Sequence, residues 1–194
     1  QTRLKLSKLP YRKTLDEFDF EFQPSINKET IAELATLVFA ERNENILFMG
    51  PPGVGKTHLA VGLAMQAIEN GKTVYFTSLS HMLQDLKKAK QQNRLDRRWK
   101  VYTRAAILII DEVGYSVMDR ESAELFFQVV CKRYESGSII LTSNKHFNEW
   151  GDMMSDTVIA ATLDRLLHHS FVINIKGNTY RLKDRLRVGD VDRR

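Results

Sequence analysis

The segment Gly50-Pro51-Pro52-Gly53-Val54-Gly55-Lys56-Thr57 decides the fold class of this chain. It has the pattern G-x-x-x-x-G-K-[ST], in which glycines let the backbone bend so that its N–H groups point at phosphate oxygens. The apolar run Ile46–Met49 precedes it, and a stretch with helical spacing from about Lys56 to Glu69 follows it. A strand, a glycine loop and a helix in this order predict a phosphate-binding P-loop.

The residue types in this loop predict how it would hold a nucleotide. Lys56 would neutralise the β- and γ-phosphates, and Thr57 would place its hydroxyl on Mg²⁺. The amino end of the following helix adds the positive end of its dipole. We therefore expect ATP and Mg²⁺ as cofactors. A glycine turn before an ordinary helix is the alternative interpretation.

Polar side chains at the ends of two further apolar runs add to this prediction. Asp111 and Glu112 follow the run Ile107–Ile110. In such folds an acid at the end of a buried strand organises Mg²⁺, and a second acid can orient the attacking water, so we assign these roles to Asp111 and Glu112. Asn144 follows the run Ile139–Leu141 and is expected to sense the γ-phosphate.

Apolar runs and helical stretches alternate along the chain. The expected strands are Ile46–Met49, Thr73–Thr77, Ile107–Ile110, Ser138–Thr142 and Phe171–Lys176. The expected helices cover about 28–41, 56–69, 80–104 (one helix, or two with a break near Asn93), 121–135 and 157–169. This alternation predicts an α/β, three-layer P-loop NTPase of the AAA+ type, with a parallel central sheet and helices on both faces.

Length and composition set the domain organisation and exclude several classes. The 194 residues are 43% hydrophobic and 27% charged, as in an ordinary soluble domain. We expect a basic arm or linker over 1–24, an ATPase core over 25–176, and a short tail over 177–194 with little or no C-terminal lid. One cysteine, Cys131, excludes an internal disulfide, and no apolar run is long enough for a membrane helix. A cytoplasmic location is expected.

The net charge of +5 is unevenly distributed. If Arg94–Arg104 is a helix, Leu95, Trp99 and Tyr102 share one stripe and the arginines lie on another side. Such a cationic face suits the phosphates of DNA and predicts little sequence preference, although a solvated helix face is an equal alternative. The residues expected to bind DNA are Lys87, Lys88, Lys90, Arg94, Arg97, Arg98, Lys100 and Arg104.

Arg165 is the candidate for a group acting between subunits. Ile159, Leu163 and Leu166 would form the buried face of its helix, so Arg165 would point to solvent. An exposed arginine on a rigid helix can reach the γ-phosphate of a neighbouring subunit, although an ordinary surface arginine is the alternative. The nearby His168 and His169 lack a companion set with ligand spacing, so no metal is expected there.

Several separated motifs resemble the IstB/DnaC group of AAA+ ATPases over about residues 10–182. They are Glu44–Ala60, Asp111–Tyr115, Arg133-Tyr134-Glu135, Thr142-Ser143-Asn144, Glu149-Trp150, Asp164–His168 and Tyr180-Arg181. Three of these motifs are more similar to IstB, a helper ATPase of transposition, than to the helicase loader DnaC: Arg133-Tyr134-Glu135, Glu149-Trp150 and Asp164–His168. The resemblance implies ATP-dependent assembly into homo-oligomers on duplex DNA, with ATP at subunit interfaces, and regulation of a partner transposase. It implies a bacterial cytoplasmic protein that is nucleoid-associated when on DNA.

The resemblance also implies roles for individual residues. Lys56, Asp111, Glu112 and Asn144 take the roles given above, and Arg165 becomes an arginine finger acting in trans. From the P-loop pattern, the strand ends and, for Arg181, its place after the last strand, the residues expected to contact the nucleotide or its Mg²⁺ are Gly50, Pro51, Pro52, Gly53, Val54, Gly55, Lys56, Thr57, His58, Asp111 and Arg181.

Three alternative functions remain open from the sequence. A helicase loader of the DnaC type shares the core and differs in its partner, a hexameric helicase on single-stranded DNA. A small-molecule P-loop kinase would need an acceptor, whereas Glu112 beside Asp111 suits water activation better. A non-catalytic, ATP-gated DNA-binding module would not depend on Glu112.

Overall fold

The computed structural model describes residues 2–152 and 156–180, and its centre is one five-stranded parallel sheet. The strands are β1 (Asn45–Met49), β2 (Val74–Ser78), β3 (Ile107–Val113), β4 (Ser138–Ser143) and β5 (Ser170–Asn174). Their order across the sheet is β2-β3-β4-β1-β5. The strand β1 therefore lies between two strands that come much later in the chain, with Leu47 opposite Leu141 on one side and Val172 on the other.

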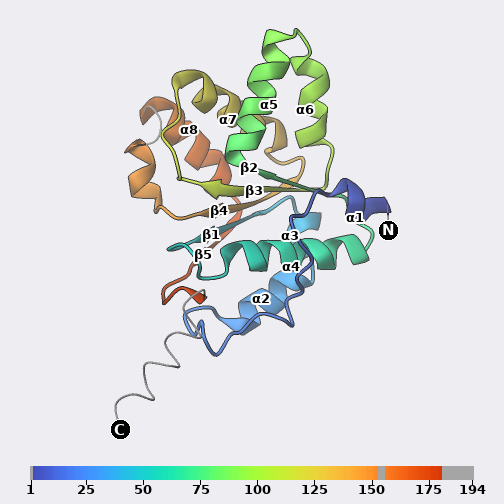
Figure 1. The fold of residues 1–194 in the computed structure, drawn as a ribbon, viewed down its shortest axis with the longest axis vertical. Helices are drawn as coiled ribbons and strands as arrows, with labels where there is room; N and C mark the ends of the chain where they lie inside the picture. Colours follow the sequence, from blue (N-terminus) through green and yellow to red (C-terminus); the bar gives the residue numbers. More distant parts are fainter. Residues whose placement is uncertain (1, 153–155, 181–194) are drawn as a thin grey trace.

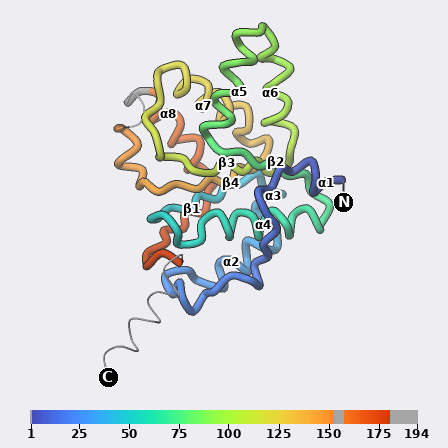
Figure 2. Tube along the Cα trace, in the orientation of Figure 1, coloured from blue at the N-terminus to red at the C-terminus, as the bar shows by residue number. Residues whose placement is uncertain are grey.

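Helices cover both faces of this sheet, as Figures 1 and 2 show. One face carries α1 (Thr2–Leu6), α2 (Lys28–Ala35), α3 (Val38–Glu41) and α4 (Lys56–Glu69). The other face carries α5 (Leu79–Gln91), α6 (Leu95–Thr103), α7 (Arg120–Arg133) and α8 (Asp156–Leu167), and a 3₁₀ turn η1 (Phe147–Asp152) precedes α8. The predicted three-layer P-loop fold is confirmed.

Alternate side chains of each strand build the two halves of the core. In β1, Ile46 and Phe48 pack with the helices of the α4 face, whereas Leu47 and Met49 pack with those of the α7 face. All four side chains are fully buried. The near-continuous apolar strands seen in the sequence follow from this burial on both faces.

Residues 2–24 pack on the core, which differs from the expected arm or linker. The backbone N–H of Phe76 donates to the carbonyl of Ser7 at 2.7 Å, and Phe18 is buried in the α4 half of the core. Leu15 lies against Gly62 of α4, where an added Cβ would come within 2.6 Å of its side chain. Apolar side chains at Leu15 and Phe18 therefore hold this segment on α4 despite its basic neighbours.

The helices differ from the sequence prediction in one place and settle a choice that it left open in another. The predicted helix over 28–41 breaks at Leu37, whose φ of 66° lets both Leu37 and Phe39 reach the core. The basic stretch is two helices, with Asn93 in a left-handed conformation between them. Trp99 and Tyr102 of α6 are buried, as their stripe predicts. In the described residues, no helix has the length and apolar character needed to cross a membrane.

Candidate active site

The glycine loop lies between β1 and α4, at the edge of the sheet where the strands end. Gly50, Gly53 and Gly55 all have positive φ values, which side chains with a Cβ rarely adopt. A Cβ on Gly53 would lie 2.0 Å from Oγ1 of Thr179, and one on Gly55 would lie 2.5 Å from the ring of Phe18. The loop is therefore held from both sides, by the segment before α2 and by the segment after β5.

Lys56 is the first residue of α4 and is buried at the base of this loop. Its Nζ donates to the carbonyl oxygens of Gly50 and Pro51, at 2.8 Å each. These bonds hold the ammonium group inside the curve of the loop. A phosphate there would meet both a fixed positive charge and the amino end of α4.

Asp111 and Thr57 come together although 54 positions separate them. The Thr57 hydroxyl donates to Oδ1 of Asp111 at 2.9 Å, and Asp111 is 7% exposed. The Thr142 hydroxyl donates to the same oxygen at 2.5 Å. A hydroxyl and a carboxylate form the hard oxygen set that suits Mg²⁺, so these residues fit the expected metal role.

Glu112 occupies a strained position next to Asp111. Its φ is 63°, and the pairing of β3 with β4 is irregular between Ile110 and Val113. Its backbone N–H donates to Oγ1 of Thr142 at 3.0 Å, which stabilises the bend. The exposed Glu112 side chain faces the cavity over the glycine loop instead of continuing the strand. Strain of this kind is concentrated at functional sites.

Asn144 follows β4 and has an unsatisfied polar atom. Its Oδ1 is buried without a hydrogen-bond partner among the described residues. Gly114 lies against it, since a Cβ there would come within 2.7 Å of Oδ1. A buried acceptor without a partner is costly, and a polar ligand in the adjoining cavity would satisfy it.

These side chains surround one cavity of about 320 Å³ above the glycine loop. Among the predicted site residues, its lining includes Gly53, Val54, Gly55, Lys56, Thr57, His58, Glu112 and Asn144. His58 binds the N-terminal segment as well, because its Nε2 lies 2.9 Å from the carbonyl oxygen of Thr14. The structure thus brings the predicted nucleotide residues together at one edge of the sheet; Arg181 lies outside the described residues.

Some residues of the cavity wall were missed by sequence reasoning. They are Tyr11, Lys13, Glu17, Phe18, Tyr115, Thr142 and Tyr180. Burial and, less strongly, the charge of Asp111 raise the pKa of Tyr11, so its hydroxyl stays protonated. Tyr180 is attached to the loop through its backbone N–H, which donates to the carbonyl of Gly53 at 2.8 Å. Tyr115, Thr142 and Tyr180 stand in motifs named above but were given no role there. Tyr11, Lys13, Glu17 and Phe18 reach the cavity through the packing of the segment before α2.

Arg165 lies at the opposite edge of the sheet from this cavity. It is in the last turn of α8, just before β5 begins, whereas the glycine loop follows the end of β1. The sequence predicts a side chain that points to solvent, but the structure leaves it half-buried. Its guanidinium lies 5.1 Å from the centroid of the Phe127 ring, and Nη1 donates to the carbonyl of Ala161 at 3.0 Å. Stacking on an aromatic ring accounts for the difference.

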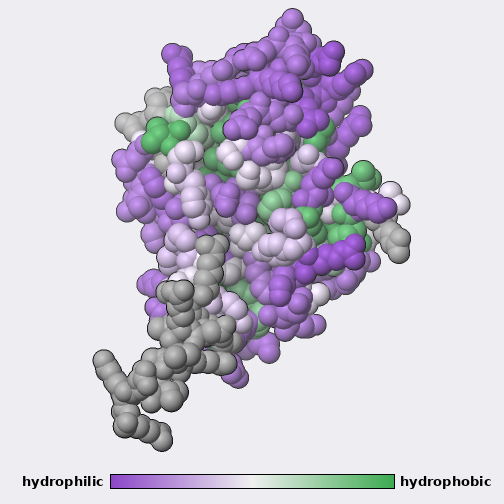
Figure 3. Space-filling model, in the orientation of Figure 1, coloured by the Kyte–Doolittle hydropathy of each residue, from purple (hydrophilic) through white to green (hydrophobic). Residues whose placement is uncertain are grey.

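The predicted DNA-binding residues divide into two groups on α5 and α6. Three are paired with acids: Lys87 with Asp119, Lys90 with Glu121, and Arg98 with Asp85. Lys88, Arg94, Arg97, Lys100 and Arg104 are exposed, and no ion pair to a carboxylate is found for them within the described part of the chain. Figure 3 shows a hydrophilic surface over these two helices.

Sequence comparison places the chain among ATP-binding proteins of insertion sequences. The sequence pattern of the IstB-like ATP binding protein family matches residues 1–188. The chain is 52% identical over 186 residues to an ATP-binding protein of insertion sequence IS5376 from Geobacillus stearothermophilus, a match that covers 95% of this chain and 74% of that protein. It is 53% identical over 190 residues to an ATP-binding protein of insertion sequence IS21 from Pseudomonas aeruginosa, covering 97% and 72%.

Structural comparison gives the same fold. DnaI superposes with a TM-score of 0.72 at 15% identity, covering 89% of this chain and 94% of that one. AMPPCP-bound DnaA from Aquifex aeolicus superposes with a TM-score of 0.70 at 21% identity, covering 94% and 57%. Likeness at these identities shows the fold alone. The site geometry and the family match over residues 1–188 together mean that this chain belongs to the IstB-like ATP-binding protein family.

Proposed function

We propose that this chain is a Mg²⁺-dependent ATPase that assembles on duplex DNA in its ATP state and regulates a partner transposase. One observation carries the proposal of hydrolysis. Glu112 and Asn144, from two neighbouring strands, face the same cavity as Lys56 and Thr57. A site that only bound ATP would not need a strained carboxylate beside the metal-binding acid.

The side chains of the cavity have separate tasks in this proposal. Lys56 and the N–H groups of the glycine loop hold the β- and γ-phosphates, while Thr57 and Asp111 hold Mg²⁺, which neutralises charge that develops on the phosphates. Glu112 orients the attacking water and accepts its proton. Asn144 donates through its amide Nδ2 to the γ-phosphate or the water. Its Oδ1, which has no hydrogen-bond partner among the described residues, accepts from a bound water.

The position of Arg165 supports assembly with ATP between subunits. Its own glycine loop lies at the other edge of the sheet, so a γ-phosphate near Arg165 would have to come from a second copy of the chain. An arginine from a neighbour stabilises charge on the transferred phosphoryl group. The helper role in transposition rests on the insertion-sequence relatives of the family. A bacterial cytoplasmic location, with nucleoid association on DNA, is part of the same proposal.

Sedimentation with random-sequence duplex DNA tests this function. In ATP and Mg²⁺ we expect large DNA-bound assemblies, and in ADP we expect them to dissolve. The same experiment with single-stranded DNA tests a second candidate, a helicase loader, which the fold of DnaC and DnaI favours. A preference for single-stranded DNA would favour the helicase loader over the transposition helper. Assembly that is the same in ATP and in ADP would contradict both functions.

We expect the cations on and beside α5 and α6 that have no acidic partner among the described residues to contact DNA. Neutralising Lys88, Arg94 and Arg97 to glutamine should weaken duplex binding and reduce the slope of log K against log salt by about 2–3, because each phosphate contact contributes about 0.9. Lys87→Gln/Lys90→Gln is the matched control, since these lysines are already paired with acids. Equal losses in both variants, or unchanged binding in the first, would place the DNA elsewhere.

A further inference from the structure

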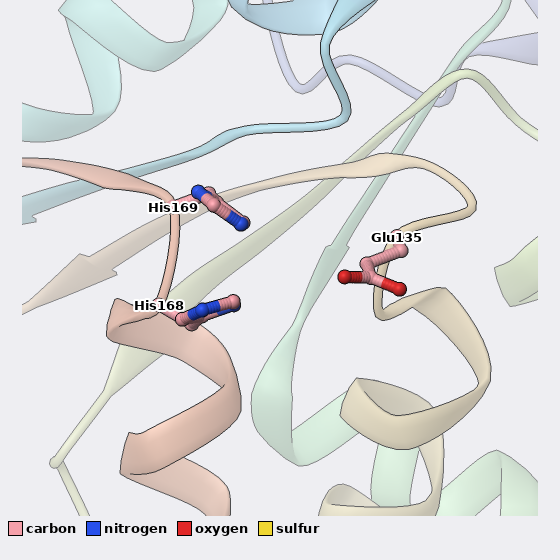
Figure 4. Close-up of side chains that lie close together, drawn as sticks. All are labelled: Glu135, His168 and His169. Atoms are coloured by element: carbon pink, nitrogen blue, oxygen red, sulfur yellow. The ribbon is translucent and has the colours of Figure 1, made fainter.

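We propose that Glu135, His168 and His169 form a binding site for a divalent transition metal of borderline softness, such as Zn²⁺. Glu135 lies in the turn between α7 and β4, and the two histidines form the turn between α8 and β5. One ligand atom from each residue lies within 4.8 Å of the others. Figure 4 shows the carboxylate and the two rings turned toward a common space. This space is at the edge of the sheet where the strands begin, opposite the nucleotide cavity.

Backbone contacts hold the two turns together without any metal. Asn45, at the start of the intervening strand β1, donates its N–H to the carbonyl of His169 at 2.8 Å, and its Oδ1 accepts from the N–H of Ile139 at 2.8 Å. Asn43 Nδ2 donates to the carbonyl of Glu135 at 3.1 Å. The positions of the ligands are thus fixed by the sheet, so little ordering would oppose metal binding.

The side chains are also oriented locally. The Tyr134 hydroxyl lies 2.7 Å from Nδ1 of His168. In the tautomer that suits a metal, Nδ1–H donates to this oxygen and Nε2 keeps a free lone pair. Glu135 itself has a φ of 57°, a left-handed conformation that a non-glycine residue rarely adopts. Orientation of a histidine by a second hydrogen bond is a regular feature of metal sites.

The chemistry of the donors selects the class of metal. Two imidazoles and one carboxylate are the ligands preferred by Zn²⁺, Ni²⁺ and Cu²⁺, and three protein ligands leave a position open for water or another ligand. Mg²⁺ prefers oxygen ligands alone, so it would remain at Thr57 and Asp111. No metal was expected at the two histidines from the sequence, because the third ligand, Glu135, is 33 positions before His168 and no local spacing indicates it.

The arginines near this cluster are already engaged by other groups. Arg133 donates to the carbonyls of Tyr102, Ala105, Ala106 and Ser138. Arg165, which lines a cavity of about 140 Å³ together with Glu135 and His169, is stacked on Phe127. Arg42 lines the same cavity but is exposed, so solvent screens its charge. None of these arginines therefore competes with a metal ion for the carboxylate of Glu135, whose described side-chain partner is the neutral Tyr134 hydroxyl.

Titration of the untagged chain with Co²⁺, followed by displacement with Zn²⁺, tests the site. We expect visible d–d bands that saturate at one equivalent and disappear when Zn²⁺ is added. Zn²⁺ at a 100-fold excess over its Kd should raise Tm by about 5–10 °C, as one tight ligand does for a domain of this size. Glu135→Gln and His169→Ala should each weaken metal binding by at least about 10–100-fold. A loss of this size is typical when a residue that only hydrogen-bonds to a metal ligand is removed, and removing a ligand itself should cost no less.

His81→Ala removes an exposed histidine outside the cluster and is the matched control. It should leave the Co²⁺ spectrum and the Zn²⁺ affinity unchanged. Glu135→Gln keeps the size of an exposed side chain, so it tests the site even if a histidine variant folds poorly. Binding that Glu135→Gln leaves intact, or that His81→Ala weakens equally, would overturn the proposal.

Discussion

Replacing Glu112 by glutamine is expected to lower kcat for ATP hydrolysis by about 100-fold to 10,000-fold, the usual contribution of a general base. Glutamine keeps the size of the side chain and its ability to touch the water, but it cannot accept the proton. ATP binding should persist, because Lys56 and Asp111 are unchanged. Glu112 makes its described hydrogen bond through the backbone N–H, to Thr142, so the substitution should leave the bend of β3 intact.

Steady-state phosphate release and equilibrium binding of a fluorescent ATP analogue measure the two effects separately. Glu33→Gln, an exposed position on α2 remote from the cavity, is the matched control and should hydrolyse ATP normally. If Glu112→Gln turned over ATP at the normal rate, the chain would be an ATP-gated module whose catalytic residue lies elsewhere. If the variant failed to bind ATP, the carboxylate would act in binding and the assignment as a base would not stand.

The second large effect is expected at Arg165. Arg165→Ala should lower the ATPase rate of the assembled protein by about 1,000-fold to 100,000-fold, the range for an arginine that stabilises phosphoryl transfer. Because Arg165 lies far from the glycine loop of its own chain, its substitution should lower the ATPase rate only at sites formed between two subunits. Arg120→Ala, an exposed arginine of α7, is the control for removing surface charge.

Mixing experiments separate a role between subunits from a loss of folding. Lys56→Ala subunits lack a phosphate-binding lysine but keep Arg165, and Arg165→Ala subunits have the opposite defect. Random pairing in an equal mixture should restore activity at about one quarter of interfaces, because each such interface combines one intact loop with one intact arginine. Absence of rescue at every ratio, with both variants folded, would exclude Arg165 as an interface residue.

Most of the nucleotide site could be predicted because its residues lie where strands meet loops. Lys56, Asp111 and Glu112 each belong to a short pattern that combines an apolar run with a polar ending. Parallel strands bring such endings to one edge of a sheet, so their convergence follows from the fold class. The register of β3 with β4, which places Thr142 beside Asp111, depends on contacts between distant segments and was not predictable from local pattern.

The remaining differences come from contacts between segments far apart in the chain. Phe18 and Thr179 reach the glycine loop from opposite ends of the sequence. Phe18 belongs to the pattern Thr14–Phe20, which resembles the segment before the core of the IstB/DnaC group, but that pattern does not show what Phe18 packs against. Charge along 1–24 suggested a basic arm or linker, whereas the burial of Phe18 holds this segment on the core. Likewise Lys87 and Lys90 belong to a basic run, but the acids that pair with them are more than 30 positions away.

The strand order β2-β3-β4-β1-β5 has a consequence for the chain as it leaves the ribosome. Strand β1 is made early, but both of its neighbours, β4 and β5, are made after residue 137. Until then its apolar residues Ile46–Met49 have two open edges and no sheet to enter. Pairings of such long sequence separation fold slowly and leave hydrophobic strands available to aggregation. A nascent chain would therefore carry a complete glycine loop long before it could fold a nucleotide site.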